Sequence, residues 1–493
     1  MRLIKPITCF IPIRIFHVLL FGWEFCFQDF LYIASPAVLP PGVVQVAIKN
    51  QAESAEHWSE SAEFKRRGHP DRLADSIASA AGSTLLDLDK NARFDLQAIV
   101  HFGPLHAQNG RGEAPIVSGE IPIVFICGQL GTSVDKLVYE SKIDAAVRAV
   151  FKSVGYSAGN TFDPKDIHVF KSFNQQSSDI AAGIDKGQLH GAGDATISIA
   201  YASNQTREHL SASHALALKA NQLLDTAFEQ GAVSGLEPDG KVQVEIEFAG
   251  YKNGFAIHPA KASNIIVAAQ HSHGIGRLQF VKSIQELVRT ANELVVTPAG
   301  RRLNLITKKT GIVVDGAGDF VTGGPVADTG VSGRMDSLYV SGSTRTYGGG
   351  LLVGRDVTKT DVSCLLSARS IAIHLVNGFA QNAEVKITYA IGATSPSSLI
   401  VTTQGCKYSG GQLAHAIREA FDLSPDGMKK SLKLGAVDFA SIAKNGFIGV
   451  DANGSHRWET VDKEKIEILR HHLRRGVIVP AANSQRVKTK AQN

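Results

Sequence analysis

The sequence has few sulfur-containing residues, and its five cysteines are not spaced for a disulfide framework. They occupy positions 9, 26, 127, 364 and 406, are odd in number and include no C-x-x-C pair. Disulfide-rich secreted domains and structural zinc sites both need closely spaced cysteines. We therefore interpret the cysteines as reduced thiols and expect a cytoplasmic protein without a zinc site.

The first fifty residues lack an uncharged run of the ~20 residues that a membrane span needs. Their most apolar part, residues 7–39, is interrupted by Arg14, Glu24 and Asp29. Positive charges precede an apolar run at residues 15–23, as in a signal peptide, but no convincing small-residue cleavage site follows. We predict no membrane association, and expect residues 1–52 to be an N-terminal extension that is disordered or reflects a start codon assigned too far upstream.

Three widespread catalytic motifs are also missing. No G-x-x-x-x-G-K-[ST] is present, which excludes a P-loop, and no G-x-G-x-x-G follows a predicted strand, which argues against a Rossmann dinucleotide site. No G-x-S-x-G occurs, which removes the nucleophile elbow of the α/β-hydrolases. Nucleotide binding would therefore need a different arrangement of residues.

Charge of one sign is only slightly in excess. Lysine plus arginine total 51 against 46 for aspartate plus glutamate, and much of the surplus lies between Arg470 and Lys490. A mildly basic chain end is more often solvated than bound to nucleic acid. We expect residues 466–493 to form a basic tail and predict no nucleic-acid partner.

Strands and helices mix in each of three predicted domains, residues 53–185, 186–322 and 323–465. Short or alternating apolar runs predict strands, and apolar residues three or four apart predict helices. The predicted strands are residues 96–102, 121–126, 167–173, 196–201, 242–248, 264–270, 311–314, 385–391 and 399–403, and the predicted helices are residues 134–154, 207–228, 280–294 and 367–376. A loop at 103–114 is a candidate mobile cover. Without strict βαβ alternation, this pattern favours an α+β fold.

The stretch from Arg66 to Asp75 places a histidine, two aspartates and three arginines at the predicted start of a helix. Pro70 suits a first helical position, so His69 and Asp71 would lie at the amino-terminal end, where free N–H groups favour anions. A bare carboxylate repels phosphate, whereas one that carries Mg²⁺ attracts it. The stretch predicts a polyphosphate site, with an ordinary capped helix end as the alternative.

A glycine-rich tract runs from Gly316 to Gly354 and leads to Lys359 and Asp361. Glycines let the backbone approach a ligand closely, and Arg334, Arg355 and Lys359 supply charge for phosphate. Asp361 is the kind of second carboxylate that Mg²⁺ on a nucleotide uses. The tract predicts a phosphate site, with a glycine-rich surface turn as the alternative.

A series of short motifs occurs in one order along the chain. They are Gly68-His69-Pro70-Asp71, Gly119-Glu120-Ile121, Gln176-Ser177-x-Asp179-Ile180, Gly191-Ala192-Gly193-Asp194, Pro238-Asp239-x-Lys241, Gln270-His271-Ser272, Phe320-Val321-x-Gly323-Gly324-Pro325, Asp328-x-Gly330-x-x-Gly333-Arg334, Gly348-Gly349-Gly350, Lys359-x-Asp361 and Tyr389-Ala390-Ile391-Gly392. In this order they resemble the motifs of the S-adenosylmethionine synthetases, from about Ala62 to about Trp458. Each motif alone is unspecific, and their shared order carries the resemblance.

The resemblance implies three similar mixed α/β domains in a pseudo-threefold arrangement, and a homodimer or homotetramer with active sites between two subunits. It implies a methionine adenosyltransferase, in which the methionine sulfur attacks C5′ of ATP. The triphosphate leaves and is then hydrolysed to diphosphate and phosphate. Such a reaction needs a preorganised cationic cradle for the leaving chain and little covalent help.

The resemblance also assigns roles to single residues. His69 would steady the leaving oxygen, and Asp71 and Asp361 would hold Mg²⁺, with two ions expected. The catalytic residues that grip phosphates would be Lys241, Arg334 and Lys359. ATP would further be bound by Arg72 and Arg355, by Phe320 on the adenine and by Asp328 on the ribose. Methionine would be received by Glu120, Gln176 and Asp194.

Five positions depart from the family pattern. Arg67 stands where the family has an acidic residue, Arg72 and Arg355 replace lysines, Met335 replaces a further lysine, and Gln97 replaces a glutamate that helps to hold potassium. We hypothesise that Arg67 compensates for the charge lost at Met335, and Gln97 predicts weak or absent potassium activation. Two alternatives stay open: a paralogue that uses another acceptor or only hydrolyses triphosphate, and a non-catalytic nucleotide-binding subunit.

Overall fold

The computed structural model describes residues 58–109, 112–117, 119–175, 185–186, 189–342, 344–449 and 456–475. All of them belong to one compact unit, Lys49–Asn493. The predicted extension at 1–52, Gln176 and the tail from residue 476 onward lie outside the described residues. No helix among the described residues is long and apolar enough to cross a membrane.

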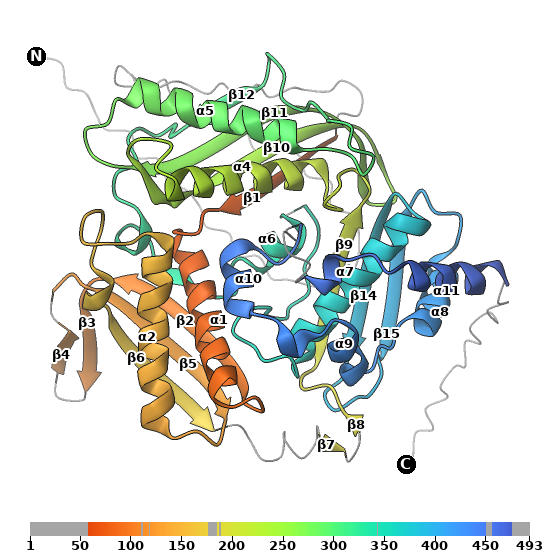
Figure 1. Cartoon of the computed structure of the whole chain (residues 1–493), viewed down its shortest axis with the longest axis horizontal. Coiled ribbons are helices and arrows are strands. Elements are labelled where there is room, and N and C mark those ends of the chain that lie inside the picture. The colour runs from red at the N-terminus through yellow and green to blue at the C-terminus, as the bar shows by residue number, and fades with distance from the viewer. Residues whose placement is uncertain are drawn as a thin grey trace, which may run out of the picture. The chain divides into compact units, whose positions relative to one another are not determined.

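Three larger sheets, each with helices packed on it, make up most of the described part of the chain, and two two-stranded sheets accompany them (Figure 1). The first sheet has the order β1-β10-β11-β12, and helices α4 and α5 pack on it and on each other. Its elements are β1 (Trp58–Lys65), α4 (Ala212–Glu229), β10 (Leu236–Lys252), β11 (Phe255–His271), α5 (Arg277–Leu294) and β12 (Gly311–Val314). Strand β12 runs parallel to β11, and the other neighbours are antiparallel.

The second sheet has the order β13-β2-β5-β6, and helix α1 lies on it beside α2. Its elements are α1 (Pro70–Leu88), β2 (Arg93–Phe102), β5 (Pro122–Gly131), α2 (Lys136–Val154), β6 (His168–Gln175) and β13 (Gly330–Val331). Helix α2 ends where the sequence predicts, because Gly155 takes the left-handed conformation with φ 105°. The predicted cover loop contains an antiparallel hairpin of β3 (Leu105–Asn109) and β4 (Gly112–Val117).

The third sheet has the order β15-β14-β9 and packs on α7, with α8 and α11 at its side. Its elements are β9 (Thr196–Ser203), α7 (Thr360–Gly378), β14 (Asn382–Tyr389), β15 (Ser398–Gln404), α8 (Gly410–Ala420) and α11 (Lys463–Arg474). Helix α11 buries Ile466, Leu469 and Leu473, which are spaced for one helical face. The first residues of the predicted tail are therefore a packed helix and not a solvated chain end.

Shorter elements connect the sheets. They are η1 (Pro164–Asp166), β7 (Asp185–Lys186), β8 (Leu189–His190), η2 (Gly324–Val326), α6 (Asp336–Ser341), α9 (Pro425–Ser431), η3 (Leu434–Ala436), α10 (Phe439–Asn445) and η4 (Arg457–Glu459). Helix α10 packs on α1, and α6 contacts β1 and β9. These connectors join the three sheets around the glycine-rich tract.

In each of the three larger sheets, one strand comes from a different predicted segment of the chain than the other strands. Strand β1 pairs with β10, β9 pairs with β14, and β13 pairs with β2. A strand from each of the three predicted segments therefore lies in the sheet of another segment. The α+β fold class is confirmed, whereas the proposed boundaries at 185/186 and 322/323 stay a prediction.

Two hydrophobic cores hold these layers together. The larger core is formed by side chains of the first and third sheets and of helices α4 and α7. The smaller core lies between α1, α2 and the second sheet. Helix α7 is buried along nearly its whole length, from Thr360 to Val376. A helix buried on every side shows no 3.6-residue periodicity, which is why the sequence predicted its start only at residue 367.

Candidate active site

His69 caps the amino-terminal end of α1. Its backbone is extended, with φ −63° and ψ 137°, and Pro70 follows as the first helical residue. The backbone N–H of Asp71 donates to Nδ1 of His69 at 3.2 Å. An accepting Nδ1 leaves the neutral ring with its proton on Nε2. The cap therefore presents an N–H donor at the helix end.

Three cations surround Asp71 and His69. Lys65 Nζ lies 2.7 Å from Asp71 Oδ2, Arg334 lies 3.6 Å from Oδ1, and Lys241 lies close enough to His69 to affect its charge. Arg334 and Lys241 keep 56% and 46% of their side chains exposed, so a solvent-borne ligand can reach them. We call Lys65, His69, Asp71, Lys241 and Arg334 the His69 group.

The charge states in this group follow from burial and from the neighbouring cations. Burial, together with the charges of Lys65, Lys241 and Arg72, lowers the pKa of His69 to about 3, so the ring is neutral at physiological pH. Burial raises the pKa of Asp71, but hydrogen bonds from Lys65 and Val331 outweigh it and hold that pKa below its ordinary value. The helix end thus carries one ionised carboxylate, one neutral donor and an excess of positive charge.

A second charged group lies at the amino-terminal end of α7. Arg355 is hydrogen-bonded to Asp361 and lies 3.3 Å from Asp95 and 3.7 Å from Asp194. Lys359 Nζ lies 3.8 Å from Asp194, and the hydroxyl of Thr196 donates to Asp361 at 2.7 Å. We call Asp194, Arg355, Lys359 and Asp361 the Asp361 group. Like the His69 group, it combines a helix end with carboxylates and cations.

Motif glycines bring distant parts of the chain into contact at both groups. A side chain at Gly330 would collide with the Pro70 carbonyl, and one at Gly193 would come within 2.6 Å of the Thr358 carbonyl oxygen. The glycine-rich tract therefore lies directly on the start of α1, and the Gly191–Asp194 motif lies on the start of α7. Only glycine allows these close backbone approaches.

The remaining predicted ligand residues are placed as follows. Phe320 is half-buried, Asp328 is exposed with a carboxylate oxygen that accepts from the Thr329 N–H at 2.8 Å, and Glu120 is exposed. Gln176 lies outside the described residues. No hydrogen bond or ion pair places Glu120 or Asp328 in either group, so their roles stay predictions.

Arg66 and Arg72, two arginines of the stretch from Arg66 to Asp75, make their contacts inside the protein. Arg72 is 3% exposed, donates to the carbonyls of Lys65 and Lys444, and lies over the ring of Tyr339. These contacts support a structural role and not ATP binding. Arg66 is fully buried and ion-paired to Asp225 at 3.1 Å.

The contacts of Arg67 argue against the compensation hypothesis, which stays a prediction. Its guanidinium is hydrogen-bonded to Glu229 and, at 3.0 Å, to Asn445, and it lies 3.8 Å from Asp225. Because carboxylates on α4 pair with its charge, these contacts do not favour Arg67 as the cation missing at Met335. Met335 itself is fully buried in the larger core.

Sequence reasoning missed Lys65 and Asp95. Lys65 ends strand β1, which was not predicted, and Asp95 lies in β2 beside an isolated bridge to Arg355. Asp95 pairs with Arg355, which is far away in the chain, whereas Lys65 pairs with Asp71, only six residues later but in a different element. A charged residue at a strand end was the only local signal.

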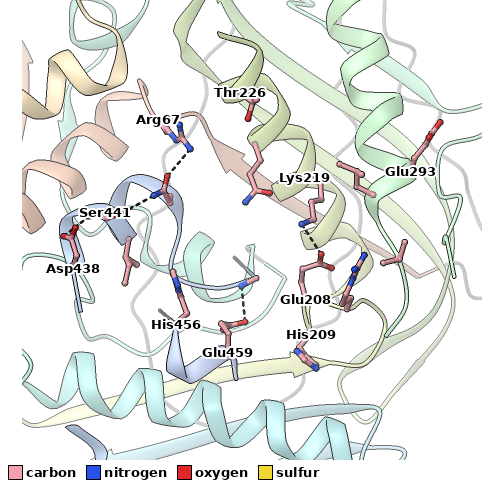
Figure 2. A pocket seen from close by; sticks show the side chains of 17 residues that line it. Arg67, Glu208, His209, Lys219, Thr226, Glu293, Asp438, Ser441, His456 and Glu459 are labelled. Carbon is pink, nitrogen blue, oxygen red and sulfur yellow. Dashed lines mark hydrogen bonds and ion pairs between the residues drawn. The ribbon is translucent and has the colours of Figure 1, made fainter. Parts of the chain in front are cut away.

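A cavity of about 1040 Å³ is a separate feature (Figure 2). It lies by α4 and α10, and the residues of the His69 and Asp361 groups do not line it. Among its lining residues, Lys219 lies 3.0 Å from Glu208, and Asp438 caps α10. Free N–H groups at a helix end favour anions, so the two helix ends remain the better candidates for phosphate chemistry.

Within the described residues, no cluster of three or more histidine, cysteine, aspartate or glutamate side chains could enclose a metal ion. Asp71 and Asp361 belong to different groups, and each faces cations. Such isolated carboxylates suit Mg²⁺ that arrives with a nucleotide, because this ion keeps waters and phosphate oxygens among its ligands.

Comparison with known families bears on both groups. Residues 189–320 match the S-adenosylmethionine synthetase central domain, and residues 322–460 match the S-adenosylmethionine synthetase C-terminal domain. The two matches cover more than half of the chain and include Lys241, Arg334 and the whole Asp361 group. The chain belongs to the S-adenosylmethionine synthetase family.

Proposed function

We propose that the protein is a methionine adenosyltransferase, which forms S-adenosylmethionine from ATP and L-methionine and hydrolyses the triphosphate to diphosphate and phosphate. The main support is the His69 group, in which a neutral Nε2–H donor and three cations meet at one helix end. Family membership makes this chemistry the natural reading of that geometry.

The reaction asks the protein to stabilise a leaving triphosphate. As the methionine sulfur attacks C5′, the C5′–O bond breaks and negative charge grows on the departing oxygen. His69 would donate its Nε2–H to that oxygen, and Lys65, Lys241 and Arg334 would hold the phosphates. Donors fixed before the reaction need no reorganisation as the charge develops, which lowers the barrier.

The Asp361 group would complete the site. Asp194 would receive methionine together with Glu120 and Gln176, while Arg355 and Lys359 would bind ATP phosphates. Phe320 and Asp328 would hold the adenosine. Among the described side chains, no hydrogen bond or ion pair joins this group to the His69 group, so we propose that one subunit's His69 group works with its partner's Asp361 group.

A homodimer or homotetramer would bring the groups together. Exposed isoleucines lie on all three sheets: Ile99 on β2, Ile197 on β9, and Ile266 and Ile400 on β11 and β15. Apolar side chains on sheet surfaces are suited to burial against a second copy. Their distribution supports a broad subunit interface.

Mg²⁺ would be bound at Asp71 and Asp361, with two ions per site. The donors fit, since both are carboxylates in the first turn of a helix and both lie among groups suited to phosphate. When bound, the ions would neutralise part of the triphosphate charge.

Gln97 stands where the family has a glutamate that helps to hold potassium. Its side chain is exposed and uncharged, so we predict equal turnover in sodium-only and potassium buffers. A clear gain in turnover in potassium buffer would contradict this prediction.

The decisive experiment incubates the purified chain with ATP, Mg²⁺ and methionine. Mass spectrometry detects S-adenosylmethionine, and triphosphate hydrolysis is measured in parallel. Triphosphate hydrolysis without the sulfonium product would favour a second function, a triphosphatase or a transferase for another acceptor. Met335 supports keeping this alternative, because a buried apolar side chain stands where the family has a cation.

A further inference from the structure

The motif Gln270-His271 has no role in the proposed chemistry, yet both side chains are only 2% exposed and make specific polar contacts. They end strand β11, next to the segment that carries Phe320. We propose that Gln270 and His271 are positioning residues that hold the adenine-contacting Phe320 at a fixed place relative to Lys241 and the phosphates. This inference rests on the proposed function, since it takes Phe320 as an ATP contact.

His271 is hydrogen-bonded to both the backbone N–H and the backbone carbonyl of Phe320. Its backbone N–H donates to the Phe320 carbonyl at 2.9 Å, and the Phe320 N–H donates to His271 Nε2 at 3.2 Å. His271 Nδ1 lies 3.0 Å from the Ser272 carbonyl, to which it can only donate. In the neutral ring the proton therefore lies on Nδ1, and Nε2 is the acceptor that the Phe320 N–H needs.

Gln270 holds the residues that follow. Its amide nitrogen donates to the Val321 carbonyl at 3.1 Å, and its side chain fills the space next to Gly323, where any Cβ would collide with it. Its amide oxygen accepts from the Asp239 N–H at 3.2 Å. One side chain thus joins the Phe320 segment to strand β10.

Asp239 extends the connection to the phosphate side. It is 5% exposed and accepts from the Gly324 N–H at 2.7 Å, and it lies two residues before Lys241 on β10. On the other side, Pro238 abuts Gly68, the residue before His69. The Gln270–His271 pair therefore connects the adenine end of the proposed site to both Lys241 and His69.

The proposed positioning role predicts different effects on the binding of ATP and of inorganic triphosphate. ATP spans both ends of the site, whereas inorganic triphosphate uses only the phosphate end. If the pair positions Phe320, its loss should weaken ATP and leave triphosphate nearly unaffected. A general structural role would weaken both.

The experiment measures dissociation constants for ATP and for inorganic triphosphate, each with Mg²⁺, by calorimetry on the full chain. His271→Leu, which removes the Nε2 acceptor, should weaken ATP binding roughly tenfold and change triphosphate binding less than about twofold. His271→Gln, whose amide oxygen can accept the Phe320 N–H, should restore most of the ATP affinity. In a Phe320→Ala background, His271→Leu should add little, because the contact it positions is already gone.

Equal weakening of ATP and triphosphate by His271→Leu, or an unchanged ATP affinity, would overturn the proposal. If that variant does not fold, Gln270→Met gives the same comparison from the other residue. A wild-type chain that binds ATP without forming S-adenosylmethionine would refute the proposed function, while the affinities would still decide the positioning role. Wild-type binding of neither ligand, or equal affinity for both, would overturn the positioning role.

Discussion

At the scale of single residues, the two ring nitrogens of His69 have different functions. Nδ1 accepts the Asp71 N–H and caps α1, while Nε2 keeps the proton that the proposed reaction needs. The low pKa that burial and neighbouring cations impose keeps the ring neutral. A neutral donor avoids placing another positive charge beside Lys65 and Lys241.

His69→Asn separates these functions. Asparagine is a good N-cap, because its side-chain oxygen can accept the Asp71 N–H, so stability should change by less than about 1 kcal/mol. The donor at the leaving oxygen is displaced, and kcat should fall by about 10²-fold or more. Thermal unfolding and initial rates of S-adenosylmethionine formation check the two halves, and a fully active variant would remove His69 from the mechanism.

Arg66 and Arg67 are neighbours with different environments, which gives a matched pair. Arg66 is fully buried, pairs with Asp225 and donates to the Asp239 carbonyl, so Arg66→Ala should destabilise the protein by about 3–5 kcal/mol by removing the nearest partner of these buried groups. Arg67 keeps 21% of its side chain exposed, so Arg67→Ala should cost only about 1 kcal/mol. Denaturant titration measures both.

Turnover adds a second test of Arg67. Because its contacts are with Glu229, Asp225 and Asn445, Arg67→Ala should leave the KM for ATP and kcat unchanged. A marked rise in KM would support the compensation hypothesis instead.

At the scale of elements, α1 supports the glycine-rich tract through two aspartates one helical turn apart. Asp71 accepts the Val331 N–H at 3.0 Å, and Asp75 accepts the Gly333 N–H at 2.7 Å and the Tyr339 hydroxyl at 2.9 Å. These bonds lie on either side of Ser332 and immediately precede Arg334. Helix α1, which His69 caps, therefore also positions Arg334 near Asp71.

Asp75 makes stability depend on pH. Burial raises its pKa to about 7, and the charge of Asp71 adds to this, although Gly333, Tyr339 and Arg72 act in the opposite direction. Asp336, whose pKa burial and Asp75 raise, also faces it. The folded state therefore holds this proton more tightly, so the stabilising contribution is full below about pH 4 and is lost as pH rises to about 7.

Asp75→Asn should remove that pH dependence. The amide oxygen can still accept the Gly333 N–H, and no charge is buried at high pH. Between pH 5 and 7 the wild type should lose up to about 1.4 kcal/mol per pH unit relative to the variant. Urea unfolding of both proteins across this range measures the difference, and parallel curves would show that Asp75 does not titrate there.

The sequence predicted elements best where local pattern decides them. Alternation predicted the strand at Val242–Phe248, and Gly155 predicted the end of α2. Strand β1 and helix α10 were missed because partners far along the chain stabilise them, and α7 was shortened because it is buried on all sides.

In the candidate site, too, local sequence pattern predicted some features, and contacts made only after folding decided the others. Ordered motifs gave His69, Asp71, Lys359 and Asp361 as residues, but not the grouping of Lys65 with Asp71. Nor could composition show that Arg72 and Arg67 face carbonyls and carboxylates inside the protein. Those facts depend on which surfaces meet after folding.

For the whole molecule, the proposed site between subunits predicts complementation. His69→Asn and Asp361→Asn homo-oligomers should each be nearly inactive. In an equal mixture that exchanges subunits, each mixed dimer would have one site with both changes and one with neither, which recovers about a quarter of wild-type activity. Activity is measured after co-refolding or prolonged mixing.

A matched control uses two changes in the same group. His69→Asn mixed with Lys241→Ala leaves every mixed site with one lesion, so no activity should return. Recovery in this control, or none in the first mixture, would contradict a site shared between subunits.

Strand β1 pairs with β10, which follows it only after the whole second sheet apart from β13 has been made. During synthesis on the ribosome, β1, the first strand of the described residues, therefore stays without its partner while α1, α2 and their sheet emerge. Late pairing of this kind is slow and leaves a strand edge exposed. The protein's yield in the cell should then depend on the pace of translation through residues 66–235, even though none of that delay is visible in the finished fold.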